Sequence, residues 1–364
     1  WAPRSHYPLN AAVGPKHEVL GYLPYWELDY DEVHWDKLTT LAYFAANMDS
    51  KGDITDFNGW FGDTSKALAA EAKTAGVRYI LTVVNFSSSS IDALVNDPAR
   101  RAHAVDGMLD AVMSMGGDGI NIDFEGVPKS AKAGLVALVT ETTAAFHAAI
   151  PGSHVSVATP AIDWNGAFDY DALAEGCDGV MIMAYGYHWK KGNPGPISPS
   201  SSGDIWGQYN LEWTILDYFK WGKKENRHKF ILGLPFYGRD WPALSDEVPG
   251  KAGGQGSYVP FHTCKDRAEA LGGFSWDAHS QTTYFIEKKN GEWRQTWCDD
   301  GPSWEAKLAL VNEYDLGGVG IWALGYERGT TDLWDAIADA LIDPLPLPEE
   351  PTEPTPENPG EGPD

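Results

Sequence analysis

The sequence predicts an α/β fold, specifically a closed (β/α)8 TIM barrel. Eight short runs rich in aliphatic residues recur within residues 18–343, and stretches with helical periodicity separate several of them. The runs are almost continuously apolar, as expected for parallel strands that are buried on both faces. Eight strand–helix repeats in a segment of this length are typical of a closed barrel. An open doubly wound sheet is the alternative, but no Gly-rich phosphate loop follows the first run.

The expected elements follow from these runs in chain order. The strands are expected at 18–26, 38–48, 77–86, 118–126, 154–164, 178–189, 229–241 and 317–327. Helical periodicity is clearest over 64–75, 97–115 and 130–150. The barrel is therefore expected to span 18–343, with residues 1–17 as an N-terminal extension.

The connection between the seventh and eighth strands departs from the repeat. In it, the stretch "TTYFIEKKNGEWRQTW" predicts a β-hairpin whose two-residue turn is Asn290-Gly291. We expect residues 242–316 to form a β-rich α+β insertion between strand 7 and helix 7 or strand 8, as one wall of a cleft at the carboxyl-terminal face. Cys264 and Cys298 both lie in this segment and are candidates for a disulfide. Cys177, at the head of an apolar run, is expected to be a buried thiol.

Composition restricts the partners of the protein. The formal charge of −25 argues against nucleic acid and anionic membranes, and no apolar run reaches the 18 residues of a membrane span. The spacing of the three cysteines fits no metal-ligand pattern, so neither a metal nor a cofactor is expected. Sixteen Trp and sixteen Tyr exceed what a core requires, and such side chains stack on sugar rings. Residues 344–364 are Pro-rich and acidic, which predicts a linker to a further module or a disordered end.

The fourth run, "GGDGINIDFEG", carries the candidate chemistry. Asn121, Asp123 and Glu125 alternate with apolar residues, so in a strand all three side chains face the barrel interior. Glu125 stands at the carboxyl end of that strand, where barrel enzymes place catalytic groups. An apolar setting and a neighbouring carboxylate both raise the pKa of a carboxyl group. Glu125 is therefore a candidate general acid, and Asp123 is its orienting partner.

Strand geometry also restricts the reaction. Two residues that are two positions apart on one strand have Cα atoms about 6.6 Å apart on the same side, so Asp123 and Glu125 cannot flank a glycosidic bond as the usual retaining pair does. Two alternatives remain open. Either a distant acid such as Glu27, Asp163 or Glu327 is the nucleophile, or the 2-acetamido group of the substrate attacks C1 itself.

Residues 118–125, Asp-Gly-Ile-Asn-Ile-Asp-Phe-Glu, resemble the DGxDxDxE signature of glycoside hydrolase family 18, the chitinase-like family. The resemblance spans roughly residues 18–340 and implies substrate-assisted catalysis. It implies that Glu125 is the acid/base and that Asp123 stabilises the acetamido group. Asn121 replaces the first inner Asp of the family, as in members that resemble bacterial cell-wall and spore enzymes, and it is able to hydrogen-bond Asp123.

Further motifs of this family are matched along the chain. Met183 and Tyr185 resemble the strand-six Met-x-Tyr, whose tyrosine holds the acetamido carbonyl. Trp322 is similar to the tryptophan that forms the floor of the −1 sugar site. Tyr22, in "GYLPYW", and Tyr237, in "LGLPFYGRDW", match the strand-one and strand-seven patterns.

Two positions depart from the family. Gly186 stands where the family usually has Asp, and "TVVNF" replaces the strand-three Ser-x-Gly-Gly. His188 and Trp189 follow the sixth strand and either line the cleft or belong to a packed loop; Trp189 is kept as a candidate substrate contact.

The resemblance implies a secreted or cell-surface, monomeric retaining hydrolase of the chitinase or N-acetylglucosaminidase type. Its substrate is expected to be a β-1,4-linked glycan that contains N-acetylglucosamine, either chitin oligomers or peptidoglycan. The alternative is a chitinase-like lectin that binds carbohydrate with little or no catalysis, and Gly186 and the missing strand-three motif favour this alternative.

Overall fold

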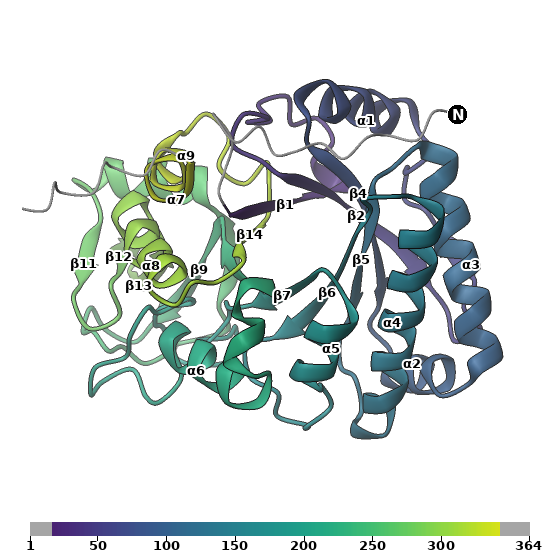
Figure 1. The fold of residues 1–364 in the computed structure, drawn as a ribbon. Coiled ribbons are helices and arrows are strands. Elements are labelled where there is room, and N and C mark those ends of the chain that lie inside the picture. Colours follow the sequence, from purple (N-terminus) through teal and green to yellow (C-terminus); the bar gives the residue numbers. More distant parts are fainter. Residues whose placement is uncertain (1–16, 343–364) are drawn as a thin grey trace, which may run out of the picture.

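The computed structural model describes residues 17–342 (Figure 1). The expected linker at 344–364 and residues 1–16 of the expected N-terminal extension lie outside the described residues.

Eight parallel strands close into a barrel, as predicted. Their ring order is β1, β2, β4, β5, β6, β7, β8 and β14, and β1 pairs in parallel with both β2 and β14. A short strand, β3 (Ile54–Asp56), adds to β2 in the antiparallel direction. The barrel strands are β1 (Glu18–Pro24), β2 (Thr40–Met48), β4 (Arg78–Asn85), β5 (Gly119–Phe124), β6 (His154–Pro160), β7 (Gly179–Met183), β8 (Phe230–Pro235) and β14 (Gly318–Trp322).

Helices surround the barrel (Figure 1). The three expected helices correspond to α1 (Asp63–Ala75), α3 (Pro98–Met115) and α4 (Lys132–Ala149). Local sequence explains such boundaries: α3 begins where the Asp97 carboxylate accepts the amide of Ala99 at 2.9 Å, with Pro98 in the first turn. The other helices are α2 (Ser88–Val95), α5 (Tyr170–Gly176), α6 (Leu211–Trp221), α7 (Phe261–Ala270), α8 (Gly301–Glu313) and α9 (Asp332–Ile337), with short helical turns at Tyr25–Glu27, Lys129–Ala131, Lys224–Lys229 and Ala338–Ile342.

Several strands are shorter than the apolar runs that predicted them. The sixth ends at Met183 instead of 189, and Gly186 follows it with a φ of 77°, which lies outside the β region. The expected seventh strand, 229–241, is two strands: β8 ends at Pro235, and β9 (Tyr237–Ala243) leaves the barrel for a second sheet. Apolar content alone does not distinguish these two strands, because both are buried.

The second sheet is antiparallel and lies beside the barrel (Figure 1). Its strand order is β10-β9-β13-β12-β11, so it begins at Tyr237 and not at the expected residue 242. The predicted hairpin is present, with Asn290 and Gly291 joining its strands at positive φ. The additional strands are β10 (Ser257–Pro260), β11 (Ser275–Asp277), β12 (Thr282–Lys289) and β13 (Glu292–Cys298).

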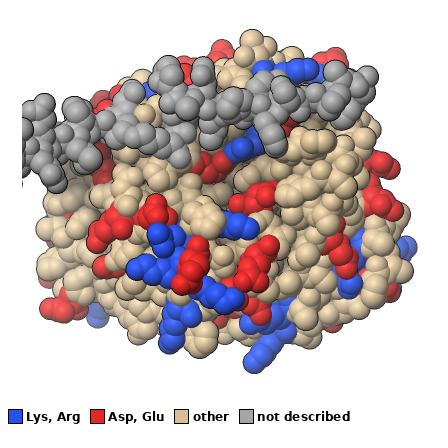
Figure 2. All heavy atoms as spheres, in the orientation of Figure 1, with Lys and Arg blue, Asp and Glu red and all other residues tan. Residues whose placement is uncertain are grey.

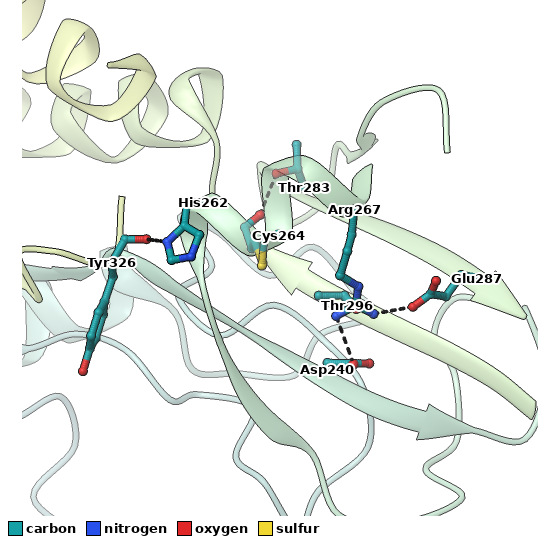
Figure 3. The surroundings of a disulfide bond; sticks show 9 residues. Asp240, His262, Cys264, Arg267, Thr283, Glu287, Thr296 and Tyr326 are labelled. Carbon is teal, nitrogen blue, oxygen red and sulfur yellow. Dashed lines mark hydrogen bonds and ion pairs between the residues drawn. A yellow bond between two sulfur atoms is a disulfide. The ribbon is translucent and has the colours of Figure 1, made fainter. Parts of the chain in front are cut away.

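A disulfide joins Cys264 of α7 to Cys298 of β13, with the Cα atoms 6.6 Å apart (Figure 3). Gly238 of β9 packs directly on the bridge, because a Cβ atom there would lie 1.9 Å from the Cys298 Sγ. Beside the bridge, the Arg267 guanidinium lies between the carboxylates of Asp240 and Glu287 and pairs with both. The insertion is thus held by a covalent bond and by ion pairs in addition to its sheet.

Charged groups of both signs are mixed on the surface. On the face drawn in Figure 2, Lys and Arg side chains lie among Asp and Glu side chains. Among residues 17–342, no helix is long and apolar enough to cross a membrane.

Replacing both Cys264 and Cys298 with Ala should lower the free energy of unfolding by about 3–4 kcal/mol, since the bridge restricts a loop of that size in the unfolded chain. Denaturant unfolding with and without reductant measures the change. Cys177→Ala is the matched control, because Cys177 is buried and free and its loss should leave the effect of reductant intact. Mass spectrometry that finds free thiols at 264 and 298 contradicts the prediction.

Candidate active site

The side chains of β5 divide between two faces, as the alternation predicted. Ile120, Ile122 and Phe124 belong to the core that packs against the helices. Asn121 and Asp123 are buried, with 0% and 6% of their surface exposed, and face the barrel interior. A strand with period two therefore places two polar groups in a space that is otherwise lined by apolar side chains.

Asn121 links three strands across the barrel. Its Oδ1 accepts from the Tyr22 hydroxyl of β1 at 3.2 Å, and its Nδ2 donates to the Ser156 hydroxyl of β6 at 2.8 Å. The expected hydrogen bond to Asp123 is not among its contacts. Tyr22 and Ser156 lie on either side of the amide and take one acceptor position of its oxygen and one of its two N–H groups.

Asp123 is a carboxyl group without a hydrogen-bond partner on its buried Oδ1 among the described residues. Burial raises its pKa to about 8, and the nearby charge of Glu125 contributes in the same direction. Asp123 is therefore neutral at pH 7, and a neutral carboxyl group both donates and accepts a hydrogen bond.

Glu125 follows β5 directly and reaches solvent through the pocket described below. The carboxyl group is nevertheless partly desolvated by the surrounding protein, and this raises its pKa. The two carboxyl groups are close enough to interact, and the charge of Glu125 adds to the raised pKa of Asp123, which is the more deeply buried of the two acids.

Tyr185 lies close to both acids. It follows β7, and its ring is 6.0 Å from that of Tyr237, edge to face. Burial raises its pKa far above the usual range, and the charges of Asp123 and Glu125 add to this effect. Its hydroxyl is therefore a hydrogen-bond donor at any pH at which the protein would work.

An aromatic group borders the two acids on the β1 and β14 side. The Trp322 ring lies 4.5 Å from Phe44, 5.8 Å from Tyr22 and 6.4 Å from Trp26. Trp322, Met183 and Tyr185 all pack on the apolar cluster inside the barrel. The candidate residues on or next to β1, β5, β7 and β14 thus meet at one end of the barrel, and Tyr237 of β9 lies beside them.

A pocket of about 620 Å³ opens from Glu125 toward the ends of β6 and β7. Trp189 lines it, as hypothesised, and Gly186 lies in its wall. Trp164 and Tyr209 also line it, and the sequence argument missed both. Trp164 ended a predicted strand, and this position at the carboxyl end of a barrel strand could have marked it as a site residue. Tyr209 lies in a long loop, where no sequence pattern marks it. The remaining lining residues are Pro160, Ala161, Ile162, Met183, Tyr185 and Tyr187.

The three distant acids considered as nucleophiles do not line this pocket. Glu27 pairs with Arg328 at 2.6 Å, and Asp163 accepts the backbone amide of Phe168 at 2.8 Å. Glu327 is 1% exposed and accepts from the Tyr30 hydroxyl at 2.7 Å. Each of these acids holds loops together. Among the described residues, Glu125 is the acid that lines the pocket, and Asp123 lies behind it and interacts with its charge. In the described part of the chain, no group of three or more His, Cys, Asp or Glu is arranged to hold a metal ion.

Comparison with known proteins agrees with this geometry. The sequence model of the family "Glycosyl hydrolases family 18" matches residues 18–327. Human di-N-acetylchitobiase is 26% identical over 350 residues, covering 85% of this chain and 80% of that protein. YdhD of Bacillus subtilis, named as a sporulation-specific glycosylase, is 27% identical over 258 residues, which cover 68% of this chain and 57% of that protein. The crystal structure of the Ostrinia furnacalis Group IV chitinase shares the fold, with a TM-score of 0.77 at 17% identity, and covers 89% of this chain and 99% of that one.

Asp123→Asn should change how stability depends on pH. In the unfolded chain this carboxyl group ionises near pH 4, whereas the folded protein keeps it protonated to about pH 8. Between these values the folded state binds more protons, so the Asp123 contribution lowers the free energy of unfolding as pH rises. Since each tenfold change in proton affinity corresponds to about 1.4 kcal/mol, Asp123→Asn should gain several kcal/mol over the wild type from pH 4 to 8.

Urea unfolding at a series of pH values measures this difference. Glu125→Gln supplies the control, because removing that charge should move the Asp123 transition to lower pH without abolishing it. Parallel stability profiles for the wild type and Asp123→Asn contradict the assignment of a neutral Asp123.

Proposed function

The chain belongs to glycosyl hydrolase family 18 and is a glycosidase, and we propose that it cleaves β-1,4 bonds next to N-acetylglucosamine with retention of configuration. The observation that carries the proposal is the pair of acids at the carboxyl end of β5, Asp123 buried within the strand and Glu125 directly after it and open to the pocket. One acid can reach a glycosidic oxygen, and the other lies behind it within the barrel. The nucleophile that attacks C1 must then come from the substrate.

The proposed first step uses the proton of Glu125, which burial retains at higher pH than in water. Glu125 donates this proton to the glycosidic oxygen while the acetamido carbonyl oxygen attacks C1, so that the C1–O bond to the leaving sugar breaks. The Tyr185 hydroxyl donates a hydrogen bond to that carbonyl oxygen, and Asp123 accepts a hydrogen bond from the acetamido N–H. Positive charge that develops on the oxazolinium ring is stabilised by the carboxyl dipole of Asp123, which keeps its proton, and lowers the pKa of that group.

The second step reverses these roles. The Glu125 carboxylate takes a proton from water as the water oxygen attacks C1, and the oxazolinium ring opens to restore the acetamido group. C1 is inverted twice, so the product keeps the configuration of the substrate. Chitin and peptidoglycan both carry the 2-acetamido sugar that this scheme needs, and the product profile on the two polymers distinguishes them.

A second candidate is a binding protein with little or no catalysis. Gly186 favours it, because the family usually places an acid there and this chain offers only backbone beside Tyr185. The retained pair of Asp123 and Glu125 favours the hydrolase.

We also infer that the protein works outside the cell or at its surface. The Cys264–Cys298 disulfide supports the location, because disulfides persist in oxidising compartments.

Glu125→Gln should lower kcat on a fluorogenic N-acetylglucosamine oligomer by about 10²–10⁴-fold, since the amide cannot donate the proton that the leaving oxygen needs. Binding of the same oligomer, measured by calorimetry, should remain within a few-fold of the wild type. An unchanged kcat refutes the role of Glu125. A wild-type protein that binds the oligomer but releases no fluorophore identifies the binding protein instead.

The anomer formed first is a separate prediction. Proton NMR during hydrolysis of a β-linked oligomer should show the β-anomer of the new reducing end before mutarotation, because two inversions at C1 restore the configuration. The α-anomer as first product rules out participation by the acetamido group.

A further inference from the structure

The long loop that joins β7 to α6, residues 184–210, brings both Trp189 and Tyr209 to the pocket. It contains no helix or strand, and loops of this length are commonly mobile unless other contacts fix them. Trp189 keeps 55% of its surface exposed, and Trp164, on the loop that follows β6, keeps 72%. Two open indole faces at one pocket are costly in water and suit a ligand with flat apolar faces.

Trp206 connects this loop to the second sheet. It is 7% exposed, and its Nε1 donates to the Asp277 carboxylate of β11 at 2.6 Å. Its ring lies 5.0 Å from Trp297 of β13, edge to face. Trp206 is therefore held from two strands of the insertion at once.

The other side of Trp206 contacts the neighbour of Trp189. The His188 ring packs on it edge to face at 5.4 Å, and His188 Nδ1 lies 2.9 Å from the carbonyl oxygen of Pro196. Gly195 also lies against this ring, because a Cβ atom there would come within 2.5 Å of His188 Cδ2. A continuous path of contacts thus leads from the insertion through Trp206 and His188 to Trp189.

Hydrogen bonds to backbone groups also fix the same loop to the insertion at further points. The amide of Ser200 donates to the carbonyl of Ser280 at 2.9 Å, and the Ser201 hydroxyl donates to the carbonyl of His279 at 2.7 Å. The amide of Gly256 donates to the carbonyl of Lys190, next to Trp189, at 2.7 Å. The insertion therefore determines where the Trp189 wall of the pocket stands.

We propose that Trp206 is a positioning residue through which the insertion sets the preference for long oligosaccharides. It holds Trp189 where the indole stacks on a sugar unit outside the reacting ring, and it does not touch the reacting atoms. This inference rests on the proposed function and deepens it, since it names what selects substrate length. A short substrate that fills only the reacting position makes no contact with Trp189, so its turnover should not depend on where Trp189 is held.

The test compares kcat/KM for a hexamer of N-acetylglucosamine with kcat/KM for a short fluorogenic glycoside of the same sugar. Trp189→Ala and Trp206→Ala should each lower the ratio of the two about three- to tenfold through the KM of the hexamer, the value of one aromatic contact. The double variant should lose no more than Trp189→Ala alone, because both changes remove the same contact. The ratio is unaffected by a fraction of misfolded protein, which lowers both values equally.

Gly195→Ala is the second variant, because its methyl group displaces His188 without removing a core side chain. It should lower the ratio as Trp206→Ala does. Trp276→Ala is the matched control: this tryptophan stands on the same strand as Asp277 and is 46% exposed, and its loss should leave the ratio unchanged.

An unchanged ratio in both Trp206→Ala and Gly195→Ala overturns the inference while the proposed function stands. Additive losses in the double variant overturn it as well, since Trp206 would then act by another route. A wild-type protein that cleaves neither substrate overturns the proposed function. In that case calorimetry with the hexamer tests the inference by itself. Equal losses of affinity in Trp189→Ala and Trp206→Ala support it, and unequal losses overturn it. If the wild type does not bind the hexamer, both the proposed function and the inference are overturned.

Discussion

A carboxyl group enclosed by a parallel barrel cannot hold a charge without paired or hydrogen-bonding partners, and Asp123 meets this constraint by staying protonated. The rest of the site follows from it. Asn121, which is neutral at every pH, fills the position one step deeper and ties Tyr22 to Ser156. Glu125, one step nearer the pocket, is the acid that solvent reaches. Exposure to solvent thus increases along the chain from Asn121 in the barrel interior, through Asp123, to Glu125 at the pocket.

The barrel and the second sheet contribute different things to the pocket. The barrel strands place Asp123 through backbone pairing, and Glu125 and Tyr185 stand just beyond the ends of β5 and β7. The outer wall depends on side chains and loops, since Trp189 stands on a segment that the insertion holds through Trp206. The acids and the Trp189 wall are therefore held mainly by different parts of the fold, and Tyr237 of β9 is a contact between the second sheet and Tyr185.

Sequence reasoning predicted the elements that depend on short-range patterns. The two faces of β5 follow from a period of two residues, and the hairpin follows from Asn290-Gly291, whose residues adopt positive φ. It did not separate β8 from β9, because both are apolar, and only pairing partners distinguish them. The partners of Asn121 and the place of Tyr209 depend on segments far away in the chain, and a single sequence carries no signal for such contacts.

Gly186 illustrates how a departure from a family pattern can be built into the backbone. Its φ of 77° starts a turn after which the amide of Tyr187 donates to the carbonyl of Ile197, so the course of the chain itself differs from a continuing strand. Space for a side chain exists at this position, yet any L-residue there pays roughly 1 kcal/mol or more for the left-handed conformation. An acid at position 186 would thus find space beside the pocket, at the cost of strain in the turn that leads to the contact between Tyr187 and Ile197.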